Sequence, residues 1–305
     1  MRTGFALVLV AAIGGGAARA EPRPERRRDA TWGQIFAGPF SSSRLFAMPV
    51  ADVVGPYRLT LSEDGSLLQE TGILSSAGVV ALGFGDLAQL EYRHTTAISV
   101  GHTPAPVPAA GVQVKLPLPE GMYLPAVAIA FRLGVTRREQ LAATTVDEAV
   151  TDLYVVSRLH LWGWLAGVTV HAGARVSQAR IGIGGDQDFG ATKRVMVLPA
   201  AGFEIAMNDR TRLVGEAGLA PSFRYDATAP SPPTIGSGLL GRLGVRWRIA
   251  PALTLDGSIG YQLEVARMQP AAGLSAVVQW DIRLGAEVVV PWGAIACRTA
   301  GIFCE

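Results

Sequence analysis

The sequence has few of the features that mark enzymes, helical membrane proteins or nucleic-acid-binding proteins. It contains four histidines, and it lacks a Gly-x-Ser-x-Gly elbow, a His-Glu-x-x-His pair and a phosphate-binding loop. Outside the N-terminus, no apolar run reaches the roughly 18 to 20 residues that a membrane-spanning helix needs. The formal net charge of +2 is too small to indicate nucleic acid as a partner. We therefore expect a protein of none of these three classes.

Cysteine is equally scarce, since the chain has only Cys297 and Cys304, close to its end. In an oxidising compartment, such a pair is expected to form a disulfide that closes a small loop. Two cysteines without a nearby histidine do not supply the four ligands of a structural zinc site. Asp186 and Asp188 lie among glycines in 182–190, but without the spacing of a recognised calcium loop. The sequence predicts no metal and no cofactor.

The N-terminus has the pattern of a secretory signal peptide. Arg2 provides positive charge, 5–13 is a short apolar stretch, and Ala18-Arg19-Ala20 has the small residues of a cleavage site. The apolar stretch is too short for a membrane anchor. We predict a signal peptide over 1–20, export, and a mature chain that begins near Glu21.

The most informative pattern is a strict alternation of apolar and polar residues, repeated three times between Ser237 and Val290. Side chains of a strand point alternately to opposite faces, so each repeat has one apolar and one charged face. Strands of about 9 to 11 residues with this pattern are typical of a transmembrane β-barrel. The 49% hydrophobic content and mean hydropathy of +0.30 agree with apolar residues dispersed over such strands.

Extending this pattern predicts an all-β protein, a transmembrane antiparallel up-and-down barrel over 57–292. Long and short connections alternate, and an even strand number places both termini on the periplasmic side of a bacterial outer membrane. Residues 21–56 have no apolar period, so they form either a periplasmic segment or a plug inside the lumen, and 293–305 form a periplasmic tail. Twelve strands are predicted at 57–62, 77–84, 87–95, 110–117, 123–134, 150–162, 164–178, 193–207, 210–221, 237–249, 252–265 and 276–290.

Two pairs of short motifs point to a narrower group. They are Phe84-Gly85-Asp86 with Leu90-Glu91-Tyr92-Arg93, and Gly111-Val112-Gln113-Val114-Lys115 with Pro125-Ala126-Val127-Ala128. They resemble hairpins of uncharacterised outer-membrane barrels associated with exopolysaccharide secretion, which implies outer-membrane lipid around the barrel and a possible secretion-complex partner. One departure is that many such barrels end on a terminal Phe or Trp, whereas here a tail follows Trp292.

Parity along the strands places more basic than acidic residues on the lumen wall. Arginine binds carboxylates and phosphates through two hydrogen bonds, which predicts a narrow channel or transport-associated protein that favours anionic solutes or saccharides. Two alternatives remain: charges that only pair and hydrate, and a structural or secretion-accessory barrel without its own pore. The candidate lumen residues are Arg58, Arg93, Lys115, Arg132, Arg242, Arg246, Arg248, Asp256, Asp281 and Arg283.

An outer-membrane lipid esterase is a weaker alternative, because His94 is the nearest outward-facing candidate and has no evident nucleophile beside it.

The hairpin around Ala250-Pro251-Ala252 allows a prediction of register. A three-residue turn would pair Ile249 with Leu253. Arg246 would then lie opposite Asp256, close enough for an ion pair. Arg242 would lie opposite Gly260, which has no side chain, so we expect Arg242 to have no ionic partner.

Overall fold

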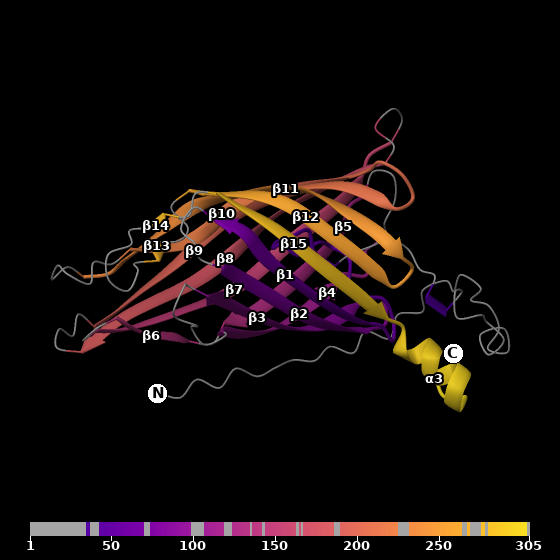
Figure 1. The fold of residues 1–305 in the computed structure, drawn as a ribbon, viewed down its shortest axis with the longest axis horizontal. Coiled ribbons are helices and arrows are strands. Elements are labelled where there is room, and N and C mark those ends of the chain that lie inside the picture. The colour runs from indigo at the N-terminus through magenta and orange to yellow at the C-terminus, as the bar shows by residue number, and fades with distance from the viewer. Residues whose placement is uncertain are drawn as a thin grey trace.

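A computed structural model of the chain shows a closed antiparallel β-barrel (Figure 1). It describes residues 35–36, 43–69, 74–98, 107–118, 124–134, 136–141, 144–162, 165, 167–185, 190–224, 232–263, 267–268, 276–277 and 280–303. The barrel strands are β1 (Leu59–Gln69), β2 (Leu74–Phe84), β3 (Ala88–Ile98), β4 (Val107–Lys115), β5 (Ala126–Gly134), β7 (Thr144–His160), β8 (Val168–Gly185), β9 (Gly190–Ala206), β10 (Thr211–Arg224), β11 (Thr234–Ala250), β12 (Leu253–Leu263) and β15 (Trp280–Val290).

Each barrel strand pairs with its neighbours in sequence, and the pairing of β1 with β15 closes the wall. The twelve predicted strands are therefore confirmed, with changed ends. Three further short strands, β6 (Arg137–Leu141), β13 (Arg267–Met268) and β14 (Ala276–Val277), form hairpin extensions beyond the wall. Among the described residues, no helix is long and apolar enough to cross a membrane.

Several connections predicted as long loops are partly strand. β1 and β2 run into the predicted loop at 63–76, β6 and β7 into that at 135–149, and β8 and β9 into that at 179–192. In the second of these regions, the ladder pairs Arg138 with Asp147, and both side chains are charged. The alternation of apolar and polar residues disappears where no apolar surface is needed, although the backbone ladder continues. The predicted strands were too short in these three regions for this reason.

The register of the β11–β12 hairpin agrees with the prediction along its length but not at its turn. Arg246 pairs with Asp256 and Arg242 with Gly260, as predicted. The pairing of Ile249 with Leu253 was wrong, because Leu253 pairs with Ala250 and the register shifts between Arg248 and Ala250. A bulge absorbs one residue in this way without changing which side chains face inward further along the ladder.

The outer wall is covered by exposed apolar side chains. Val195 and Val197 of β9 are 65% and 69% exposed, and Val245 of β11 and Leu284 of β15 are also exposed. A continuous apolar surface of this kind would be costly in water and is typical of a barrel surrounded by lipid.

Residues 43–56 run inside the barrel and lead into β1. At their start, a tight turn is closed by hydrogen bonds from Leu45 N to Met48 O (2.9 Å) and from Val50 N to Ser43 O (3.0 Å). Apolar side chains of this turn pack against small inward-facing residues of β5, together with residues of β7 and β10. This inner core contains Leu45, Met48, Val50, Ala51, Ala126, Ala128, Ala130, Tyr154, Val156 and Val214.

A second inner cluster fills the side of the barrel formed by β7, β8, β9 and β11. Its members are buried and apolar, so this part of the inner wall is packed rather than charged. The cluster contains Val146, Ala179, Ile181, Ile183, Met196, Leu198 and Ile235.

The chain ends beyond β15 in a short helix, α3 (Trp292–Ala300), at one end of the barrel (Figure 1). The ring of Trp292 packs edge-on against Tyr57, with centroids 5.3 Å apart, and Phe303 contacts both rings. These contacts fasten the helix beside the start of β1. Cys297 is fully buried and disulfide-bonded, and its predicted partner Cys304 lies outside the described residues.

Candidate functional site

The tip of the inner segment is held by a carboxylate of the wall. Three consecutive backbone N–H groups, of Phe46, Ala47 and Met48, donate to Glu216 of β10 at 3.0 to 3.1 Å. Successive N–H groups that converge on one point form a concave anion site in the backbone. Glu216 fills this site, and its buried charge is therefore compensated by main-chain dipoles.

Arginine side chains bind the carbonyl groups of the same turn. Arg246 of β11 donates to Leu45 O at 2.8 Å and to Arg44 O at 3.3 Å. Arg132 of β5 donates to Ala47 O at 3.0 Å. Donors and acceptors of the turn are thus satisfied by charged groups of the wall, as buried backbone groups require.

The other half of the segment is held mainly by neutral amides. Val54 N donates to Gln89 Oε1 of β3 at 2.8 Å. Gln113 Nε2 of β4 donates to Val50 O and Asp52 O, at 2.6 and 2.7 Å. Arg158 of β7 forms an ion pair with the Asp52 carboxylate.

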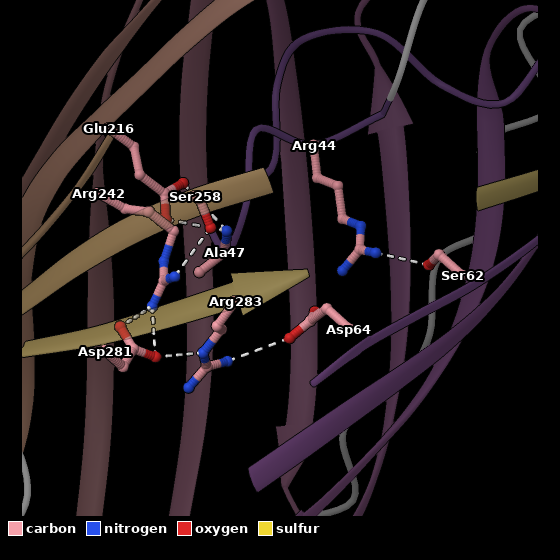
Figure 2. Close-up of polar contacts among 9 residues, drawn as sticks. All are labelled: Arg44, Ala47, Ser62, Asp64, Glu216, Arg242, Ser258, Asp281 and Arg283. Carbon is pink, nitrogen blue, oxygen red and sulfur yellow. Dashed lines mark hydrogen bonds and ion pairs between the residues drawn. The ribbon is translucent and has the colours of Figure 1, made fainter. Parts of the chain in front are cut away.

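The contacts of the segment are distributed around the whole wall. Arg44 Nη2 donates to Ser62 Oγ of β1 at 2.5 Å, which adds a strand that β11, β12 and β15 separate from Glu216 of β10 (Figure 2). The segment is hydrogen-bonded to β1, β3, β4, β5, β7, β10 and β11. Residues 43–56 therefore cross the lumen and are bound on all sides of it.

A chain of ion pairs links three strands beside the segment. Arg242 Nη2 of β11 lies 2.8 Å from Asp281 Oδ1 of β15, and Arg283 connects Asp281 to Asp64 of β1 (Figure 2). The prediction that Arg242 has no ionic partner was wrong. Gly260 of β12 lies between Arg242 and Asp281, and its missing side chain lets the two groups meet across β12.

Other predicted lumen residues are paired as well. Glu91 forms ion pairs with Arg132 at 3.3 Å and with Arg93 at 3.8 Å. Arg246 Nε donates to Asp256 at 2.9 Å. In these pairs, each cation has a carboxylate close by, so the wall is charged but largely neutralised.

Three predicted residues lie at or near the strand ends. Arg248 donates to Asp209 O in the turn before β10, at 3.1 Å. Arg58 lies directly before β1, where its carbonyl accepts from Gly83 N, and Lys115 is the last residue of β4. The structure does not bring these three residues together with the group around Arg242.

A cavity of about 220 Å³ lies between the tip of the inner segment and the wall. Arg44, Leu45, Phe46 and Ala47 form one side of it. The wall contributes polar residues, which are Ser62, Glu63, Asp64, Arg93, Arg242, Asp256, Ser258 and Arg283, and small or apolar ones, which are Ala77, Leu240, Gly285 and Ala286. Four guanidinium groups and two lumen carboxylates thus line one space.

The remaining candidates give no second site. His94 lies on the outer wall, with its Nε2 3.8 Å from Glu63 Oε2. Within the described ranges, no group of three or more His, Cys, Asp or Glu residues could hold a metal ion. Asp186 and Asp188 lie outside those ranges.

Gln89 and Gln113 were missed by the sequence analysis, which considered charged lumen residues. Both are buried and lie on inward-facing positions of predicted strands. Their inward-facing positions could therefore have identified them as lumen residues, although only the course of residues 43–56 shows what they bind.

No family model and no curated protein matches the sequence. Among solved structures, the chain is similar to the translocator domain of the autotransporter NalP from Neisseria meningitidis, with 14% identity, a TM-score of 0.44, and coverage of 76% of this chain and 87% of that one. It is also similar to the KdgM porin, with 8% identity, a TM-score of 0.43 and coverage of 76% and 98%. For the Acinetobacter baumannii outer membrane protein Omp33, the values are 8%, 0.35, 76% and 97%. These likenesses concern the barrel fold alone.

Proposed function

We propose that this protein is a non-enzymatic outer-membrane channel whose lumen is closed by residues 43–56 and opens when that segment is displaced. The observation that carries the proposal is the binding of one short segment by seven strands around the lumen. The segment acts as a plug in this proposal. The exposed apolar outer wall supports the membrane location.

The bonds of the plug suit a reversible closure. They are polar and go mainly to single side chains, so water can replace each of them when the segment leaves. A continuous strand of the wall, by contrast, shares a full ladder of backbone bonds with both neighbours.

Selection of anionic solutes is a further part of the proposal. It is supported by the four guanidinium groups that line the cavity beside the plug. The ion pairs along the wall oppose a strong preference based on net charge alone. Any selection therefore has to come from local geometry, through paired hydrogen bonds from arginine to a carboxylate or phosphate.

The decisive experiment weakens the binding of the plug in the lumen by changing one side-chain atom of Glu216. Glu216→Gln replaces a carboxylate that accepts from three amides with a group that has one acceptor oxygen and two donors. A hydrogen bond to a charged group contributes about 1.5 to 3 kcal/mol, so a loss of about 2 kcal/mol would raise the unseated population about 30-fold. We expect the purified variant to show a higher open probability than the wild type in planar bilayers.

Glu204→Gln is the matched control. Glu204 is a buried carboxylate of β9 that forms an ion pair with Arg212 at 2.7 Å and lies 3.7 Å from His171 Nε2, and both partners belong to the wall. Its loss should leave the open probability near that of the wild type. If folded Glu216→Gln protein also shows no conductance, the channel proposal fails.

The second candidate is a structural or secretion-accessory barrel that never opens. The apolar core between the inner turn and β5 favours it, because such packing resembles a permanent filling rather than a gate. The same conductance measurement separates the two functions.

A further inference from the structure

The cavity beside the plug combines two kinds of hydrogen-bonding group. Arg242 and Arg283 reach it from the wall, and Arg44 reaches it from the plug (Figure 2). Each guanidinium carries five N–H donors, so it can hold a wall partner and a ligand at the same time. Between these cations lie acceptors and hydroxyl groups, provided by Asp64, Asp256, Ser62 and Ser258.

This mixture fits a particular class of ligand. Guanidinium groups bind a carboxylate through paired hydrogen bonds, whereas aspartate and serine accept hydrogen bonds from hydroxyl groups. An inorganic anion would use only the cations and would be repelled by the aspartates. A neutral sugar would hydrogen-bond to the aspartates and serines, but it has no carboxylate to accept paired hydrogen bonds from a guanidinium group.

The size of the cavity matches a small ligand. At roughly 30 Å³ for each water molecule, its volume of about 220 Å³ equals about seven waters. This space accommodates one monosaccharide unit.

We propose that this cavity binds a single sugar acid, a monosaccharide with one carboxylate, and that binding holds the plug in its seated position. The inference rests on the proposed function, since it assigns a ligand and a regulatory effect to the same lumen. The regulatory part follows from the composition of the site. Arg44, Phe46 and Ala47 belong to the plug and the other groups to the wall, so the complete site exists only when the plug is seated.

A ligand shifts an equilibrium toward the state that binds it better. A sugar acid that requires both halves of the site therefore stabilises the closed state by a factor of one plus the ratio of its free concentration to its dissociation constant. At 100 times the dissociation constant, this factor is about 100. The occupant of the cavity closes the channel rather than opening it.

Binding is tested by titration calorimetry of the full-length protein with D-glucuronate, using D-glucose and inorganic phosphate as comparison ligands. We expect glucuronate to bind more tightly than either, because only glucuronate uses the cations, the aspartates and the serines together. Equal binding of phosphate and glucuronate would overturn the assignment to sugar acids. No binding of glucuronate would overturn the site.

Arg44→Met and Arg212→Met form a matched pair of variants. Both remove one lumen cation, but Arg212 pairs with Glu204 on the wall and does not line the cavity. We expect Arg44→Met to raise the dissociation constant about 10-fold or more, and Arg212→Met to leave it within about 2-fold. If Arg44→Met does not fold, Ser258→Ala replaces it, because its hydroxyl lines the cavity and accepts from Arg242 at 3.0 Å. Equal effects of the cavity variant and Arg212→Met would refute the location.

The regulatory effect is measured on the Glu216→Gln channel. Glucuronate near 100 times its dissociation constant should lower the open probability, and glucose should not. A rise in open probability, or no change while glucuronate is bound, would refute the coupling. If Glu216→Gln conducts but glucuronate does not bind, only this inference fails. If no variant conducts and glucuronate still binds through Arg44, the channel function fails and the binding site stands.

Discussion

Replacing Gly260 with alanine should break the ion pair that crosses β12. A Cβ atom at position 260 would lie 2.4 Å from Asp281 Oδ1 and 2.6 Å from Arg242 Nη2, well inside van der Waals contact. Both charged side chains are buried, with 5% of the Arg242 side chain and 0% of the Asp281 side chain exposed. Breaking a buried pair by removing one partner costs about 3 to 5 kcal/mol. Because Asp281 keeps its contact with Arg283, we expect the free energy of unfolding of Gly260→Ala to fall by about 3 kcal/mol, the lower end of that range.

The assay is a urea titration in phospholipid vesicles, followed by the gel shift that distinguishes folded from unfolded barrels. Gly257→Ala is the control on the same strand, because a Cβ there faces outward and lies 3.5 Å from Leu284, an ordinary contact. Its unfolding midpoint should remain close to that of the wild type. The same midpoint for Gly260→Ala and Gly257→Ala would refute the idea that a missing side chain is what permits the Arg242–Asp281 pair.

Two further predictions concern the outer wall and the β6–β7 hairpin. Val245→Arg should impair membrane insertion much more than Ser258→Arg in a vesicle insertion assay, since an arginine facing lipid near the midplane costs about 2 to 4 kcal/mol and an inward one stays hydrated. Equal insertion would contradict the assigned faces. The hydrogen bond from Arg138 lowers the pKa of Asp147 below its usual value of 3.8. This pair therefore stabilises the hairpin above the pKa of the unfolded chain and loses its effect as pH falls through the lower folded pKa. A titration of Asp147 by NMR should show the lowered pKa in the wild type, and a normal pKa in Arg138→Met.

The alternation of apolar and polar residues along the chain was sufficient to predict the barrel wall. Each strand has to place apolar side chains on the outer face and polar side chains on the inner face. Val245 and Arg246 are neighbours in sequence, yet one is exposed on the outer wall and the other is buried inside. The same parity correctly placed Arg246 opposite Asp256.

The partner of Arg242 could not be found by that reasoning. To predict this partner, one needs the register of β12 with β15 as well as that of β11 with β12. The ion pair also depends on Gly260, a residue without a side chain. The course of residues 43–56 could not be predicted either, because that segment forms no long ladder of backbone hydrogen bonds and has no apolar period. Its conformation is set by wall groups far away in the sequence, such as Glu216.

The dependence of the plug on distant strands has a consequence for assembly of the barrel. Phe46 precedes its acceptor Glu216 by 170 positions, and Leu45 precedes Arg246 by 201. The segment is therefore synthesised well before the strands that bind it, and β1, which follows it, must still find β15 to close the seam. A barrel that closed without one of its hairpins would leave some of the segment's amide and carbonyl groups without partners, at about 1 to 3 kcal/mol for each group. Binding of the segment in the lumen therefore stabilises the complete ring of strands more than a ring that lacks a hairpin.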